Sequence, residues 1–176
     1  MNTFDEHRRH AQHGYTFEVA TISSSRYRRH ENANSPEKAD DVSGSIIIDA
    51  LCANGHTVRY TLLPDDIDMI QDWFKKSIMD ADALITTGGT GLAPGDVTIE
   101  AIRPLLEKEM PGFGEIFRAN SMKEIGSAAM LTRAIAGVAS GCTVFCMPGS
   151  PNAVKLGIEL ITSEIGHVIE HAKGRV

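Results

Sequence analysis

The stretch DALITTGGTGLAPGD, residues 82–96, carries a short apolar run directly into a glycine-rich loop. Its apolar part, DALITT (82–87), is typical of a buried strand. The segment after the loop, VTIEAIRPLLEKE (97–109), has the apolar spacing of a helix in which Pro104 marks a kink or a break. A P-loop would need Gly-Lys-Ser or Gly-Lys-Thr, and a dinucleotide-binding loop would need a third glycine where Pro94 stands. The stretch is therefore a strand, a loop and a helix, and its glycine loop is neither a P-loop nor a dinucleotide-binding loop.

The same alternation of strand and helix continues on both sides of this stretch. The residues before it predict two strands and two helices, and those after it predict two strands joined by a tight turn and a long last helix. The strands are FEVATIS (17–23), TVRYTLL (57–63), IAGVAS (135–140) and TVFCMP (143–148); the helices are GSIIIDALCANG (44–55), DDIDMIQDWFKKSIMD (65–80) and residues 151–174. This order predicts an α/β fold, a three-layer α/β/α sandwich with a mostly parallel sheet and one late antiparallel hairpin.

The length of the chain predicts one globular domain, and its charge and apolar pattern predict no binding to nucleic acid or to a membrane. The chain has 176 residues, 42% of them hydrophobic, and its 17 basic and 23 acidic residues give a net charge of −6. A net acidic chain has no overall bias towards DNA or RNA. The first residues are charged and no apolar run reaches about 18 residues, so we expect a cytoplasmic protein. We expect a polar N-terminal tail, residues 1–14, and a single domain, residues 15–176.

Two other features have ordinary structural interpretations. Residues 23–41 are rich in Arg, Asn, Ser and Glu, which predicts a mobile loop that could lie over a site. The three cysteines are odd in number and contain no CxxC pair. Because Cys142 and Cys146 fall in an apolar strand, we expect them to be buried thiols.

The glycine loop is expected at the edge of the sheet where ligands bind, because open parallel sheets bind ligands at the carboxyl ends of their strands. Glycines let a backbone approach a flat or phosphorylated ligand and leave N–H groups to point at it. Asp96 after the loop, and Asp65 or Asp66 after strand 57–63, fit helix N-caps. If the two strands are adjacent and parallel, Asp65 and Asp96 instead meet at one edge. Two carboxylates facing a phosphate need a cation between them, which predicts a magnesium–nucleotide site.

Two further loops end at this edge. DDVSGS (40–45) places Ser43 and Gly44 at the start of a helix, and MPGSPNAV (147–154) places Ser150 before Pro151. Ser as an N-cap and Pro at the first helical position are ordinary helix starts. Such starts also present free N–H groups suited to an anion.

Several of these motifs together identify a family. They are TTGGTG, the following GDVTIEA, and then EMPGFGEIFR, LTRAIAG and MPGSPNAV. From about Phe17 to the last helix the chain resembles the MoaB/MogA family of molybdenum-cofactor biosynthesis proteins, and more closely its MoaB branch. The resemblance implies a MogA-like, molybdopterin-binding fold and a molybdopterin adenylyltransferase. Such an enzyme converts ATP and molybdopterin, with Mg²⁺, to adenylylated molybdopterin and diphosphate, as a step towards the molybdenum or tungsten cofactor.

The resemblance also implies partners. A homotrimer or homohexamer is expected, alongside other molybdenum-cofactor biosynthesis proteins. In the block GFGEIFR, the side chains of Phe113, Ile116 and Phe117 are expected to leave apolar surface that a neighbouring subunit covers.

Site residues carry over position by position. Asp65 and Asp96 match the acidic residues of the family's magnesium and phosphate site, and are the expected catalytic and metal-binding residues. Arg133 is expected to meet a phosphate or a subunit interface. The substrate-binding residues that the resemblance implies are Ser23, Ser43, Gly44, Gly88, Gly89, Thr90, Gly91, Thr98, Glu100, Arg133, Pro148, Gly149 and Ser150.

The chain departs from the family pattern at three positions near the site. Gly95 stands where many members have Arg, Ile99 where many have Pro, and Ser24 where many have Asp. The first change removes a positive charge near the expected phosphate. The main alternative function is a non-catalytic molybdopterin-binding or scaffolding paralogue of the same fold, and retention of both Asp65 and Asp96 favours the enzyme.

Overall fold

The protein is described by a computed structural model that covers residues 14–31 and 33–175. Within these ranges six strands form one sheet in the order β2-β1-β3-β6-β5-β4. They are β1 (Thr16–Ile22), β2 (Thr57–Leu63), β3 (Ala83–Thr87), β4 (Lys108–Glu109), β5 (Ile135–Ala139) and β6 (Cys142–Met147). Strands β2, β1, β3 and β6 run parallel, whereas β5 is antiparallel to β6 and β4 to β5. The predicted fold class and the late hairpin are confirmed.

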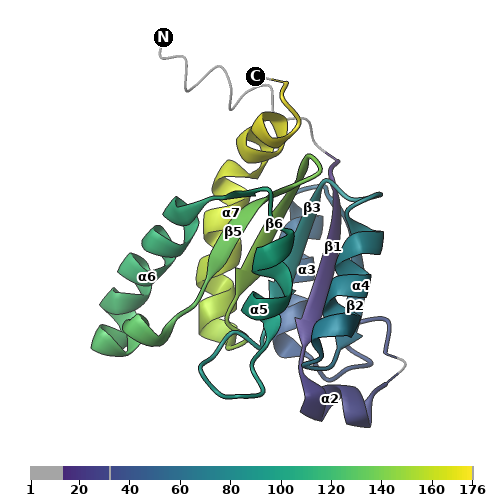
Figure 1. The fold of residues 1–176 in the computed structure, drawn as a ribbon, viewed down its shortest axis with the longest axis vertical. Helices are drawn as coiled ribbons and strands as arrows, with labels where there is room; N and C mark the ends of the chain where they lie inside the picture. The colour runs from purple at the N-terminus through teal and green to yellow at the C-terminus, as the bar shows by residue number, and fades with distance from the viewer. Residues whose placement is uncertain (1–13, 32, 176) are drawn as a thin grey trace.

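Helices cover both faces of the sheet and complete three layers (Figure 1). One face packs against α3 (Val42–Ala53), α6 (Pro111–Ile125) and α7 (Pro151–Ala172), and the other against α4 (Ile67–Ser77) and α5 (Thr98–Ile102). Successive strand residues point to opposite faces. Strand β1 therefore sends Phe17 and Val19 into the first layer, and Ala20 and Ile22 into the second.

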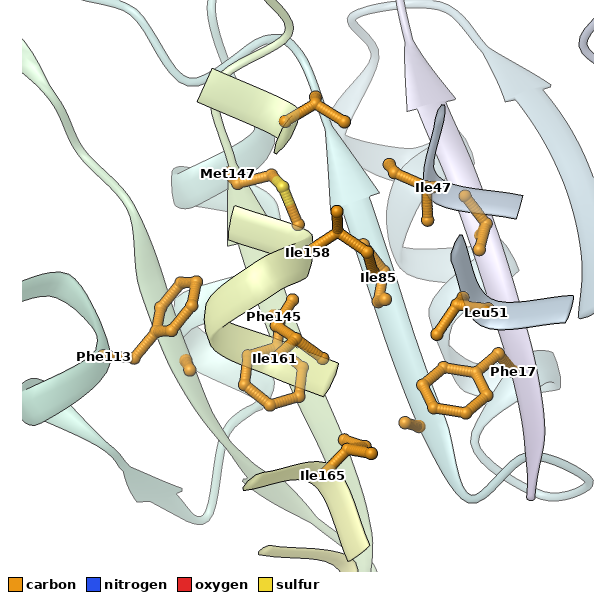
Figure 2. Close-up of a cluster of buried hydrophobic side chains, with 14 of the residues drawn as sticks. Phe17, Ile47, Leu51, Ile85, Phe113, Phe145, Met147, Ile158, Ile161 and Ile165 are labelled. Carbon is orange, nitrogen blue, oxygen red and sulfur yellow. The ribbon is translucent and has the colours of Figure 1, made fainter. Parts of the chain in front are cut away.

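The larger core lies between the sheet and the helices α3 and α7 (Figure 2). Helix α3 contributes Ile47 and Leu51, and α7 contributes Ile158, Ile161 and Ile165, with every one of these side chains at most 5% exposed. Full burial of such a side chain contributes roughly 1.5–3 kcal/mol. This packing fixes both helices, and with them the loops at their N-terminal ends.

Residues 97–109, predicted as one helix, form three elements. Helix α5 ends at Ile102, the 3₁₀-helix η1 (Arg103–Leu105) follows, and Lys108 and Glu109 pair with β5 as β4. Pro104 has no N–H, and its ring would clash with the carbonyl four residues back, so α5 cannot continue through it. The helix therefore breaks next to Pro104, where the sequence predicted a kink or a break. The edge strand β4 was not predicted.

Residues 23–41, predicted as a mobile loop, contain the short helix α2 (Ser24–Arg29). Its N-cap is Ser23, whose Oγ accepts a hydrogen bond from the Arg26 N–H at 3.4 Å. The Arg26 guanidinium in turn donates to the carbonyl oxygens of Ala39 and Asp40, at 3.1 and 3.0 Å. The helix was not predicted, because SSRYRR has no apolar stripe; capping by Ser23 and the arginine contacts hold it instead.

The expected apolar surface of GFGEIFR is mostly interior. Phe113 and Phe117 are buried on α6, and the Phe113 ring packs edge-on against Phe145 of β6 with their centroids 5.2 Å apart. Only Ile116 of the predicted three is exposed. Phe113 and Phe117, four residues apart, lie on the helix face that packs against the sheet, and Ile116 lies outside this buried face. Further exposed apolar side chains follow on α6 and on the 3₁₀-helix η2 (Gly126–Leu131): Met122, Ile125, Met130 and Leu131.

The carboxyl ends of β1, β2, β3 and β6 lie at one edge of the sheet, the lower edge in Figure 1, beside α2. Strand β1 lies between β2 and β3, so the two strands expected to be adjacent are each paired with β1 instead. Of the predicted tail, only Gly14 falls within the described residues. Among the residues that the structure describes, no helix is both long enough and apolar enough to span a membrane.

Candidate functional site

Close backbone packing accounts for two glycines at this edge. Gly88 has φ +91°, and a Cβ on it would lie 2.3 Å from the carbonyl oxygen of Ile22. From the end of β6, Gly149 approaches so closely that its Cβ would lie 3.0 Å from the Gly88 Cα. Any side chain at Gly88 would meet backbone that cannot yield. The backbone at the ends of β1, β3 and β6 therefore packs together without side chains in between.

Helix α5 fixes the glycine loop, residues 88–91, from the other side. The Thr98 Oγ1 donates to the Gly88 carbonyl at 2.8 Å, and the Thr98 N–H donates to the Gly89 carbonyl at 2.9 Å. Thr98 is fully buried. Its hydroxyl therefore positions the loop from within the protein.

The sequence left open whether Asp65 or Asp66 caps the following helix; in the structure Asp66 is the cap and Asp65 faces the glycine loop. Asp66 is the N-cap of α4 and accepts a hydrogen bond from the Met69 N–H at 2.9 Å. Asp65 Oδ2 accepts from the N–H and the hydroxyl of Ser24, at 2.9 and 2.8 Å. Its Oδ1 faces the glycine loop, only 2.7 Å from where a Cβ on Gly89 would lie. Ser24, one of the departures from the family pattern, thus holds Asp65 beside the loop.

Asp96 also faces the glycine loop and is not a helix cap. The N-cap of α5 is Val97, and Asp96 Oδ2 instead accepts from the Ala93 N–H at 3.0 Å. The same oxygen lies 2.7 Å from the position of a Cβ on Gly91. The capping alternative for Asp96 was therefore wrong. Although β2 and β3 are not neighbours, both carboxylates contact one loop, Asp65 at Gly89 and Asp96 at Gly91.

Arg133 connects the glycine loop to α5 through hydrogen bonds to both. Its Nε donates to the Thr90 carbonyl at 2.8 Å, and its Nη1 pairs with Glu100 at 2.5 Å. The hydrogen bond from Arg133 is the main reason that the pKa of Glu100 lies below its usual value. Arg133 therefore places a positive charge against the loop, although the family's arginine before Asp96 is replaced by Gly95.

These elements line an open pocket of about 340 Å³ at the sheet edge. Leu131 and Thr132 close it on the side of η2. The predicted site residues that line it are Gly88, Gly89, Thr90, Gly91, Asp96, Arg133, Pro148 and Gly149. Asp65 lies behind Gly89 and is not part of this lining.

The three predicted serines lie at helix starts outside the pocket lining. Ser150 is the N-cap of α7, and its Oγ accepts from the Ala153 N–H at 3.3 Å. Ser43 is not an N-cap, because α3 begins at Val42; its hydroxyl instead donates to the Gly149 carbonyl at 2.8 Å. Ser23 caps α2, on the side of the loop where Asp65 lies.

Sequence reasoning missed a buried group behind Ser43. Asp41 is 3% exposed, and its Oδ2 accepts from the hydroxyls of Thr21 at 2.6 Å and Tyr60 at 2.8 Å. Burial raises the pKa of Tyr60, and the neighbouring Asp41 carboxylate raises it further. The only signal was the acidic pair DD before SG, which is equally typical of a helix cap.

The chain matches known proteins over most of its length. Residues 18–167 match a family described as probable molybdopterin binding domains. The molybdopterin adenylyltransferase of Pyrococcus furiosus is 41% identical over 174 residues, which cover 96% of this chain and 98% of that protein. Molybdenum cofactor biosynthesis protein B of Halalkalibacterium halodurans is 44% identical over 170 residues, which cover 94% of each chain.

Solved structures have the same fold. The tungsten cofactor synthesizing protein MoaB from Pyrococcus furiosus superposes with a TM-score of 0.79 at 41% identity, over 91% of this chain and 98% of that one. The molybdopterin biosynthesis Mog protein from Mycobacterium ulcerans has the same TM-score, 0.79, at 22% identity, over 93% of this chain and 99% of that one. This second likeness extends to the fold alone.

Proposed function

Because the chain belongs to the family of probable molybdopterin binding domains, as its MoaB/MogA motifs predicted, we propose that it transfers the adenylyl group of ATP to molybdopterin and releases diphosphate. The proposal is supported by two relatives, 41% and 37% identical, that are named molybdopterin adenylyltransferase and probable molybdopterin adenylyltransferase. The product is an intermediate of the molybdenum or tungsten cofactor.

The observation that carries this proposal is the placement of two carboxylates against one glycine loop. Asp65 Oδ1 lies beside Gly89, and Asp96 Oδ2 lies beside Gly91. Carboxylates repel phosphate unless a cation lies between them. Magnesium usually takes one or two carboxylates together with phosphate oxygens and waters, so we assign Mg²⁺ that arrives with ATP to Asp96 on the pocket wall and to Asp65 on the other side of Gly89. They are the residues that would hold it, and when bound it neutralises phosphate charge.

The chain's own groups bind and orient the reactants. The phosphate of molybdopterin forms a new P–O bond to the α-phosphorus of ATP, and the α–β bridging bond breaks to release diphosphate. Such a transfer depends on positioning and charge stabilisation more than on a covalent nucleophile. The loop is held by hydrogen bonds from Thr98 and Arg133, and the Arg133 guanidinium, which is paired with Glu100, lies on the pocket wall. A preorganised loop of this kind reduces the cost of aligning two anionic substrates.

The direct test is an assay of the purified full chain with molybdopterin, ATP and Mg²⁺, followed by chromatography for adenylylated molybdopterin. Samples that lack ATP or that contain EDTA are the controls. We expect product only in the complete mixture. Binding of molybdopterin without any product would instead support the non-catalytic binding or scaffolding paralogue.

Assembly and cellular context belong to the same proposal. We infer a homotrimer or homohexamer, and the exposed apolar side chains Met122, Ile125 and Met130 on α6 and η2 supply a surface that a second copy would cover. A cytoplasmic location fits a reaction that consumes ATP. The protein would receive molybdopterin from, and pass its product to, other molybdenum-cofactor biosynthesis proteins.

A further inference from the structure

Asp41 occupies the N-cap position of α3 but does not cap the helix. An Asp at this position usually accepts from the helix's free N–H groups, yet the Asp41 side chain makes no such bond. Its carboxylate turns into the protein and accepts from Thr21 at the end of β1 and from Tyr60 in β2. Burial of a carboxylate is costly unless it is hydrogen-bonded, and these two hydroxyls supply the bonds.

Gly44 makes room for this buried carboxylate. A Cβ on Gly44 would lie 2.4 Å from Asp41 Oδ2 and 2.9 Å from the Tyr60 ring. Gly44 is itself buried. The absence of a side chain there is therefore explained by Asp41 and Tyr60, whatever ligand lies nearby. We call Asp41, Thr21, Tyr60 and Gly44 the Asp41 cluster.

The Asp41 cluster connects to the pocket through Ser43. Ser43 lies between Asp41 and Gly44 in the sequence, and its hydroxyl donates to the Gly149 carbonyl at 2.8 Å. Gly149 in turn packs directly on Gly88, the first residue of the glycine loop. One chain of contacts thus runs from the buried carboxylate, through the first turn of α3, to the backbone that lines the pocket.

We propose that Asp41 is a positioning residue that sets where the first turn of α3 lies, and through Ser43 sets the Gly149 backbone against the glycine loop. The proposal rests on the proposed adenylyl transfer and adds a residue to it. Asp41 is buried behind Ser43 and Gly44, so it acts through them. Its loss should misalign the reactants more than it weakens their binding.

The test compares Asp41→Asn with Asp82→Asn in the full chain. Asp82 also receives two partners, the Thr16 N–H at 2.7 Å and the Lys173 ammonium, but it precedes β3 and so lies at the opposite edge of the sheet. Misplacement by about 1 Å can cost about 100-fold in rate. We expect kcat of Asp41→Asn to fall by about tenfold or more, with KM changed less, and Asp82→Asn to keep kcat within about twofold. Both variants are assayed where circular dichroism shows them fully folded.

A second variant separates positioning from general destabilisation. Gly44→Ala adds a methyl group that must displace the Asp41 carboxylate, so it should lower kcat in the same way. Because both changes disturb one contact, the double variant should lose less activity than the product of the two single losses. Tyr60→Phe, which removes one donor and keeps the ring, should show a smaller loss. An unchanged kcat in folded Asp41→Asn, or equal losses in Asp41→Asn and Asp82→Asn, would overturn the proposal.

Crystal structures of the wild type and of Asp41→Asn decide the matter without any activity. The proposal predicts that the Ser43 Oγ to Gly149 O distance, 2.8 Å in the wild type, lengthens beyond hydrogen-bond reach in the variant. Retention of this bond would contradict the proposal. A wild type without transferase activity would instead contradict the proposed function, and the structural comparison would still decide the role of Asp41.

Discussion

Asp65 and Asp66 are neighbours in the chain with different partners, and they form a natural matched pair. Asp66 caps α4, whereas Asp65 is held by Ser24 and faces the glycine loop. The two carboxylates precede the same helix. A change that affects catalysis at one and only stability at the other would therefore separate the two roles.

Replacing Asp65 or Asp96 by Asn should lower turnover by at least about tenfold, which corresponds to about 1.4 kcal/mol in the barrier. The charge that would hold Mg²⁺ is lost, while the shape of the side chain stays. Asp66→Asn should keep turnover within about twofold, since Asn also caps helices well. Steady-state kinetics at saturating ATP and Mg²⁺ provides the measurement. Normal turnover in Asp65→Asn and Asp96→Asn would leave both residues without a catalytic role.

Alanine at Gly89 or Gly91 should weaken binding of ATP or molybdopterin by more than it lowers the free energy of unfolding. At Gly91 the new Cβ meets Asp96 Oδ2, and at Gly89 it meets Asp65 Oδ1 and Thr98. Gly89 also has φ +60°, so alanine there strains the backbone as well.

Gly55→Ala is the control for backbone strain. Gly55 has φ +80°, follows α3 at its far end, and has open space around the position of a Cβ. This variant should lose stability and bind normally. Calorimetric binding and urea unfolding of the three variants give both quantities, and unimpaired binding by the Gly89 and Gly91 variants would mean that the loop only turns the chain.

The sequence indicated the acidic residues of the site better than their partners. Asp65 follows the end of a strand and Asp96 follows the glycine loop, so both could be selected from pattern and resemblance. The roles of Ser24 and Asp41 could not be predicted, because they depend on contacts between distant parts of the chain. Ser24 contacts Asp65, which is 41 positions away, and Asp41 contacts Thr21 and Tyr60, which are 20 and 19 positions away. Pattern rules describe neighbours along one element, and these contacts join different elements.

At the scale of elements, the segments with an apolar pattern were predicted well, and two short segments without one were not. Helices α4 and α7 have apolar stripes that their sequences display, and β5 and β6 are separated by an evident turn. Strand β4 consists of two charged residues, and α2 of six residues without an apolar face. Tertiary pairing and side-chain capping create such elements, so no local pattern predicts them.

The placement of the cysteines in β6 and α3 gives a prediction about reactivity. Cys142 and Cys146 are buried in β6, and burial raises the pKa of each thiol to about 12. Cys52 is exposed on α3. Only the thiolate reacts with disulfide reagents. At pH 8 we expect the disulfide reagent dithiobis(nitrobenzoate) to modify one thiol per native chain quickly, that of Cys52, and all three thiols after unfolding. Rapid reaction of three thiols in the native protein would contradict the burial of β6.

At the scale of the whole molecule, the exposed apolar side chains of α6 and η2 give a prediction about assembly. We expect sedimentation at micromolar concentration to give a species of three or six chains of 19.1 kDa each. Met130→Asp, at a side chain that is 80% exposed on η2, should shift the distribution towards the monomer. Met79→Asp is the matched control, since Met79 is 76% exposed and follows α4 on the other face of the sheet. A wild type that sediments as a single chain would contradict the proposed oligomer.

The central claim is that the pocket beside the glycine loop transfers the adenylyl group, and the fate of each ATP phosphate tests it most directly. The full chain is incubated with molybdopterin, Mg²⁺ and ATP labelled at either the α- or the γ-phosphate, and the products are separated and counted. We predict that the α-label enters the pterin product and that the γ-label leaves as diphosphate, in equal amounts. Release of the γ-label as free phosphate, or of the α-label as ADP, would contradict the account.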